Sequence, residues 1–170
     1  MADEKQLKIL KRGVDVWNQW RLKNRGKEIN LNGADLSCGA DLVGVSLDGA
    51  NLNVANLSDA FLIGANLNNA KISNADLNGV SLDGAKLCDA DLSCVNLVSA
   101  NLSNAIFINV NLPFANLSDA NLCGAYLIGV NLIGANLQNA IFKNTNYNKA
   151  TKWPAGFDPK KVGGLVLVKR

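Results

Sequence analysis

The chain has 170 residues, of which 48% are hydrophobic and 18% charged, with a formal net charge of +3. This length suits one domain, and no segment approaches the roughly 18 consecutive apolar residues of a membrane-spanning helix. The first residues lack the apolar segment and small-residue cleavage site of a secretory signal, so the sequence predicts a cytoplasmic protein. The four cysteines, without the pairing typical of zinc sites, agree with a reducing compartment.

The charges divide the chain into three segments. Residues 1–28, the N-terminal cap, carry eight Lys/Arg and four acidic residues. Residues 29–150, the repeat region, carry four Lys and nine Asp, and residues 151–170, the C-terminal tail, carry five basic residues and one acidic residue. The net charges are therefore +4, −5 and +4, and an acidic middle lies between two basic ends.

The N-terminal cap has the apolar spacing of a helix. Its apolar residues recur at intervals close to three and four, at Leu7, Leu10, Val14, Trp17 and Leu22. Asp3 suits the N-cap position, and Gly26 suits the end of the helix. Gly13 weakens this prediction by about 1 kcal/mol relative to Ala. We expect one amphipathic helix over residues 3–25.

The repeat region has a period of five residues. From Leu42 to Tyr147, every fifth residue is large and apolar, which makes 22 consecutive units. We call this residue the centre of its unit; it is Leu in 18 units, and the residue two positions earlier is Ala in 16. The remaining positions are mostly Asn, Asp, Ser and Gly. The period matches neither a helix nor a strand, and two inward side chains per unit indicate a short extended segment followed by a turn.

Stacked coils explain this period. If each turn is near a right angle, four units close a coil of about 20 residues, and parallel ladders spaced about 4.8 Å apart join successive coils. Burying each central Leu contributes about 1.5–3 kcal/mol, which is the main driving force of such an all-β solenoid. The spacing from Leu36 to Leu42 is six, so Gly39 is expected to form a one-residue bulge in the first coil.

The residue two positions after each centre is expected to occupy the turn. It is Gly in eight units, Asn in six and Asp in three, and these residues tolerate the positive φ of a type II turn. Val54, Cys94 and Phe114 break this rule and follow one another at intervals of two coils and one coil, so they lie on one stacked corner. We predict a turn without positive φ there, at least at Val54 and Phe114.

Both ends of such a stack need a cover, because the last ladder is otherwise open. Trp17 or Trp20 is expected to cover the first coil, and Trp153 and Phe157 the last one. Residues 162–168 are predicted either to add a terminal strand to this chain or to pair with another chain.

The run ADLVGVSLDGANLNVANLSDA resembles the pentapeptide repeat family, whose consensus is A(D/N)LXX. The resemblance covers the repeat region. It implies a right-handed quadrilateral β-helix with four pentapeptides per coil, here with an N-terminal α-helical cap. The N-terminal helix and the WPAGFDP segment of the tail are similar to those of cyanobacterial members, for most of which the resemblance brings no assigned activity.

The sequence contains little that suggests chemistry. It has no His, which removes His-based acid–base catalysis and Ser-His-Asp triads, and no phosphate-binding glycine motif. We interpret the Asp residues as solvated surface. We therefore expect no catalytic residue, cofactor site or metal site, and no enzymatic activity.

Apolar residues at outward positions are more informative. The residues that flank a centre are expected to face solvent, yet several of them are apolar and recur one coil, or 20 residues, apart. These residues define a candidate apolar patch: Ile106, Ile108, Pro113, Tyr126, Ile128 and Ile133. A clustered patch is typical of a partner surface. Sequence drift is the alternative, because β-branched residues favour strands.

Three functions remain open from the sequence. The first is a non-catalytic scaffold that binds another protein or a second copy of itself. The second is binding to DNA gyrase, as in relatives that resemble duplex DNA. In this chain, the net charge of −5 of the repeat region, the Asp residues on all four of its sides and the basic ends argue against a continuous negative field. The third is attachment of the basic N-terminal cap to anionic lipid. Direct binding of nucleic acid is not expected.

Overall fold

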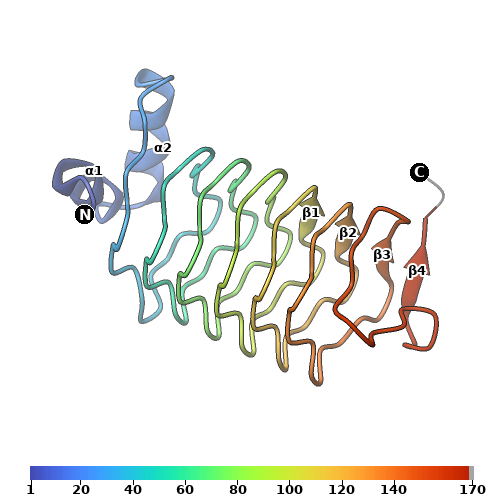
Figure 1. Cartoon of the computed structure of the whole chain (residues 1–170). Helices are drawn as coiled ribbons and strands as arrows, with labels where there is room; N and C mark the ends of the chain where they lie inside the picture. Colours follow the sequence, from blue (N-terminus) through green and yellow to red (C-terminus); the bar gives the residue numbers. More distant parts are fainter. Residues whose placement is uncertain (169–170) are drawn as a thin grey trace.

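The computed structural model describes residues 1–168, which form a stack of coils with two helices at one end and a short strand at the other (Figure 1). The helices are α1, Glu4–Leu10, and α2, Val14–Lys23. The strands are β1, Ile106–Ile108; β2, Tyr126–Ile128; β3, Thr145–Tyr147; and β4, Leu165–Leu167, and they form one parallel sheet in that order.

Parallel pairing joins residues one coil apart. Ile106 pairs with Tyr126, an interval of 20 in the sequence, and isolated bridges extend the same interval through most of the stack. Four five-residue units therefore make one coil, and the fold is a β-helix solenoid. Asp35 pairs with Asn56 at an interval of 21, whereas Asp41 pairs with Phe61 at 20, so one extra residue lies between these bridges, where Gly39 has a φ of 76°.

The bridges form four columns along the stack, and we name four sides after them. The centres of the four sides, from the first coil to the last, are Leu42, Leu62, Leu82, Leu102, Leu122 and Phe142 on side A; Leu47, Leu67, Leu87, Phe107, Leu127 and Tyr147 on side B; Leu31, Leu52, Ile72, Leu92, Leu112 and Leu132 on side C; and Leu36, Leu57, Leu77, Leu97, Leu117 and Leu137 on side D.

The core is the column of these centres together with the Ala or Val that precedes each one. Leu82 and Leu102 are fully buried, and so are Ala85 and Ala105 beside them. The large side chains fill the axis, while the small ones let neighbouring sides approach each other. This dry interior is continuous from Leu31 to Phe142 and gives the solenoid most of its stability.

The prediction for the exceptional corner is wrong. Val54, Cys94 and Phe114 have φ values of 52°, 57° and 58°, like the Gly and Asn residues at other corners. The ladder explains this result, because the Val54 N–H donates to the Ser73 carbonyl at 3.0 Å, as the other corner residues do to the next coil. The backbone pairing sets the turn, and a bulky side chain adopts positive φ at a cost of about 1–2 kcal/mol.

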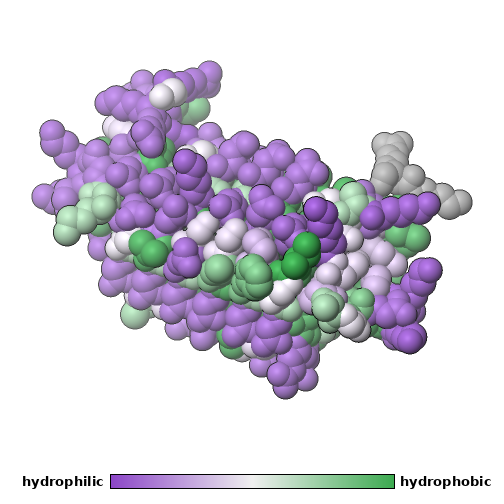
Figure 2. Space-filling view, in the orientation of Figure 1, coloured by the Kyte–Doolittle hydropathy of each residue, from purple (hydrophilic) through white to green (hydrophobic). Residues whose placement is uncertain are grey.

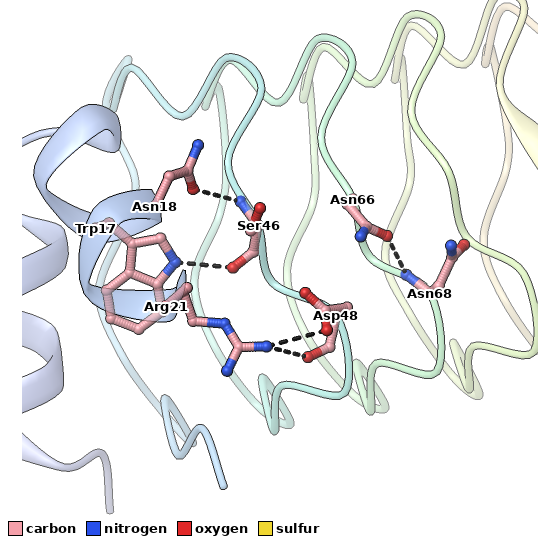
Figure 3. A network of polar contacts seen from close by, with 7 residues as sticks. All are labelled: Trp17, Asn18, Arg21, Ser46, Asp48, Asn66 and Asn68. Carbon is pink, nitrogen blue, oxygen red and sulfur yellow. Dashed lines mark hydrogen bonds and ion pairs between the residues drawn. The ribbon is translucent and has the colours of Figure 1, made fainter. Parts of the chain in front are cut away.

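Asn and Asp before a centre have a structural role. The Asn66 side chain accepts a hydrogen bond from the Asn68 N–H at 3.2 Å, and the same contact recurs around the stack (Figure 3). Where Lys71 replaces Asn, Asn53 of the preceding coil accepts from the Ser73 N–H instead, at 2.9 Å. The polar residues of the repeat therefore satisfy backbone donors that the ladder leaves unpaired.

The N-terminal cap contains two helices and not the single one expected. Asp3 caps α1 by accepting from the N–H groups of Lys5 and Gln6 at 2.8 and 3.1 Å. Gly13 separates the helices with a φ of 116°, a conformation that only glycine adopts easily. The break lets α1 reach side C, where the Asn30 carbonyl accepts a hydrogen bond from the Asp3 N–H, while α2 reaches side B.

Side chains of α2 satisfy the open edge of side B (Figure 3). Trp17 is fully buried, and its indole N–H donates to the Ser46 carbonyl at 2.8 Å, whereas Trp20 is half-buried. Asn18 accepts from the Ser46 N–H at 2.9 Å, and Arg21 lies 3.0 Å from the Asp48 carboxylate. The helix thus replaces the missing coil with side-chain hydrogen bonds.

The C-terminal tail lies over the last coil. The rings of Trp153 and Phe157 stack with centroids 4.8 Å apart, and their centroids lie 6.2 and 5.8 Å from that of Phe142. The chain then returns to side B, where β4 pairs with β3 of its own chain. Of the two alternatives for residues 162–168, the structure shows the terminal strand.

The strained corner makes a first prediction. Val54→Asn replaces a β-branched residue at positive φ by one that tolerates this conformation, and we expect the free energy of unfolding to rise by about 1 kcal/mol. The reverse change in the next coil, Asn74→Val, is expected to lower it by a similar amount. Chemical denaturation of both variants measures the effect. Equal stabilities would show that the corner is not strained.

The N-terminal cap makes a second prediction. Trp17→Phe leaves the partly buried Ser46 carbonyl without its donor, which is expected to lower the free energy of unfolding by about 1–3 kcal/mol. Trp20→Phe is the matched control, since Trp20 lies on the same helix and is half-buried. The midpoints of denaturant unfolding of the two variants are compared with that of the unchanged protein. A loss as large at Trp20 would contradict the assigned role of Trp17.

Candidate interaction surface

Four residues of the apolar patch lie on side B. Strands β1 and β2 place Ile106 directly beside Tyr126, and Ile108 beside Ile128. Tyr126 is 48% exposed and Ile108 37%, while Ile106 and Ile128 are half-buried. The structure therefore brings these four side chains together on one side of the solenoid.

The other two residues lie on side C. Ile133 is 48% exposed and stands one coil above Pro113, which is half-buried. The corner residues Asn109 and Gly129 and the outward Asn111 and Asn131 separate this pair from the side B group. The patch thus consists of two apolar groups on adjacent sides, with asparagine side chains between them.

Phe114 extends the patch and was not among the predicted contact residues. It lies at the next corner, beside Pro113, and is 67% exposed. A Cβ at Gly134 would lie 2.5 Å from the Phe114 ring, so the ring packs directly against the glycine of the next coil. The signal was present in the sequence, because Phe114 breaks the turn pattern, but we interpreted it as a backbone exception and not as an exposed aromatic residue.

Apolar side chains also occur elsewhere on the surface. Phe61 and Ile63, both exposed, lie on side A, and Ile141 lies further along the same side. Figure 2 shows hydrophobic residues in a band across a face that is otherwise mostly hydrophilic. Side A therefore offers matched positions against which the patch can be compared.

Charge is distributed unevenly around the coil. Sides D and A, with the corner between them, carry six of the nine Asp residues of the repeat region, at 35, 41, 59, 76, 83 and 119. Sides B and C, with the corner between them, carry Asp48, Asp89 and Asp91 together with Lys71, Lys86 and Lys149, and side A carries Lys143. On sides B and C the acidic and basic residues of the repeat region balance, so the apolar patch occupies the two sides without net charge.

Two carboxylates have lowered pKa values for local reasons. Burial raises the pKa of Asp91, but hydrogen bonds from Ser93 and Ser73 outweigh it, so the pKa lies below its ordinary value. At Asp35, hydrogen bonds from the Ser37 hydroxyl and N–H lower the pKa. Both groups stay ionised at neutral pH and act as acceptors. Neither has the raised pKa that a general acid requires.

Metal-binding and membrane-spanning features are absent from residues 1–168. No group of three or more Cys, Asp or Glu side chains in this range is arranged to hold a metal ion, and the four cysteines are free thiols. Neither α1 nor α2 is long and apolar enough to cross a bilayer.

Comparisons with known proteins agree with the repeat. The family model for pentapeptide repeats matches residues 70–107 and 105–144, in eight copies. Among solved structures, the pentapeptide repeat protein alr5209 from Nostoc PCC 7120 is 31% identical over 76% of this chain and 86% of that chain, with a TM-score of 0.37. No curated protein matches the chain.

Two further structures are similar. The pentapeptide repeat protein Rfr23 from the cyanobacterium Cyanothece 51142 is 29% identical over 80% of this chain and 97% of that chain, with a TM-score of 0.36. Full-length QnrB1, a plasmid-mediated fluoroquinolone resistance protein, is 18% identical over 82% of this chain and 79% of that chain, with a TM-score of 0.32. The five-residue repeat, the family model and the 31% identity to alr5209 show that this chain belongs to the pentapeptide repeat family.

Proposed function

We propose that the protein is a non-catalytic scaffold that holds another protein, or a second copy of itself, against sides B and C. The observation that supports this proposal is the apolar patch, with one group on each of the two less charged sides of the solenoid. Its side chains stand on a rigid ladder, so little conformational entropy is lost when a partner covers them. The lack of His and the ordinary role of the carboxylates support the absence of catalysis.

Phe114 is the proposed anchor of this surface. Exposed aromatic residues dominate the energy of many protein interfaces, and backbone strain often accompanies function. Phe114 combines both features, with 67% exposure and a φ of 58° at a position where Gly and Asn are otherwise common. Its ring rests on Gly134, which restricts its orientation before a partner binds.

We further propose the right-handed, quadrilateral form of the solenoid that the family resemblance implies, in a cytoplasmic protein. Four columns of bridges, with an interval of 20 in the sequence except for 21 near the two ends of the stack, support four sides per coil. Positive φ at the corner of nearly every unit supports a turn at each side boundary.

DNA gyrase is the alternative partner, and the six Asp residues on sides D and A are the observation in its favour. Duplex DNA carries one charge per about 1.7 Å, whereas a net −5 over a repeat stack of about 26 Å is one charge per about 5 Å. We therefore expect no inhibition of gyrase supercoiling at micromolar protein. Clear inhibition in that assay would favour the alternative.

The patch is tested by charge substitution. The double variant Ile108→Asp and Ile128→Asp introduces two carboxylates into the patch, and we expect it to weaken self-association or partner capture by about tenfold or more. Light scattering measures self-association, and affinity capture from the source cell measures binding of another protein.

The matched control is Ile63→Asp. Ile63 is 39% exposed, close to the 37% of Ile108, and occupies the same position of its unit on side A. Binding should survive this control. If the patch variant binds as well as the control, sides B and C are not the contact surface.

A further inference from the structure

Each coil of side D bonds to the next in a fixed pattern. The Leu117 N–H donates to the Asn136 carbonyl at 2.8 Å, and the Asp119 N–H donates to the Gln138 carbonyl at 2.9 Å. In return, the Asn136 N–H donates to the Ala115 carbonyl at 2.9 Å. The next coil thus supplies two carbonyls and one N–H group on this side, and the same pattern recurs in the coils below.

The last coil of side D lacks these partners. Among residues 1–168, no group accepts from the N–H of Leu137 or Asn139, and none donates to the Ala135 carbonyl. Leu137 is also half-buried, whereas the centres of the lower coils on side D are buried. Both the ladder and the core are therefore incomplete at this edge.

The other three sides have a covered core at the same level, and on two of them the ladder continues as well. On side B, β4 pairs with β3, and on side C the Leu132 N–H donates to the Lys152 carbonyl at 2.7 Å. On side A, Phe142 is buried beneath the rings of Trp153 and Phe157, although among residues 1–168 no group accepts from the N–H of Phe142 or Asn144. Among residues 1–168, residues 135–139 are consequently the one side of the last coil on which both the ladder and the core are open, and we call this edge the side D notch.

We propose that the side D notch binds an extended segment of a partner polypeptide, which adds to the ladder as a parallel strand. The segment accepts from the N–H groups of Leu137 and Asn139 and donates to the Ala135 carbonyl. Its middle residue points inward and is apolar, because it covers Leu137 as Leu137 covers Leu117. Its two flanking residues are polar and lie above Asn136 and Gln138.

The surroundings of the notch favour a single strand over a second copy of this chain. The matching edge of a second copy is at its first coil, near Asp35 and Ser37, where α1 and α2 stand on sides C and B. At the notch end, β4 and Lys152 already project on those same two sides. The helices of a second copy would meet them before the two ladders came within hydrogen-bonding distance, whereas a lone extended segment carries no such helices.

This site is separate from the apolar patch, so its test does not depend on the proposed function. The probe is a ten-residue peptide with the sequence of residues 111–120, which contains a side D segment with the required polar, apolar, polar order. Two-dimensional NMR of the full chain follows the titration. We expect the amide signals of Leu137 and Asn139 to shift and their hydrogen exchange to slow by about tenfold, while those of Leu117 and Asp119 stay unchanged.

Variants on both partners sharpen the test. Leu137→Asp is expected to weaken peptide binding by about tenfold, whereas Gln138→Asp adds the same charge on the outward side and should change binding by less than about twofold. A peptide whose Leu at the position of residue 117 is replaced by Asp should also bind about tenfold more weakly, which keeps the proposal testable if Leu137→Asp fails to fold.

Three results would overturn the proposal. The first is unchanged amide signals at peptide concentrations on the order of millimolar. The second is hydrogen exchange at Leu137 and Asn139 in the free protein that is as slow as at Leu117 and Asp119, since the edge would then already be paired. The third is a dimer in light scattering that Leu137→Asp dissociates, which would assign the notch to a second copy.

Discussion

The parallel backbone ladder between coils is the constraint on which the rest of the structure depends. It requires the chain to return to the same side after every four units, and it places the corner residue at positive φ in nearly every unit, bulky side chains included. The alternation of large and small inward residues then fills the axis of the coil. Outward side chains are stacked in columns as a consequence, so a local sequence exception becomes a continuous surface feature.

Much of this architecture was predictable from the sequence because the repeat is strict. The unbroken interval from Leu42 to Tyr147 predicted the coil length and the buried column, and the A(D/N)LXX units predicted the family. Asp3 was also predictable as a helix cap, since a short carboxylate there satisfies free N–H groups. These features depend on local chemistry that repeats or on a single well-known hydrogen bond.

The remaining features depend on competition between effects. Val54 and Phe114 were expected to avoid positive φ, but the hydrogen bonds on both sides of the corner outweigh their strain. Gly13 was treated as a small cost within one helix, whereas the break there lets two helices satisfy two different sides. The side D notch was not predicted either, because it depends on where the tail crosses the last coil. A pattern within single units contains no information about that path.

The two candidate contact surfaces follow from the same ladder in different ways. The patch near Phe114 presents side chains, and the side D notch presents unpaired backbone groups. Both depend on residues one coil apart lying directly beside each other, and a disulfide tests this arrangement most directly. With the four native cysteines replaced by Ser, the pair Ser81→Cys and Asn101→Cys should form an intramolecular disulfide on mild oxidation, because these residues are bridge partners on side A. The pair Ser81→Cys and Asn96→Cys, on different sides, should not. Cross-linking of the second pair but not the first would contradict the stacked solenoid.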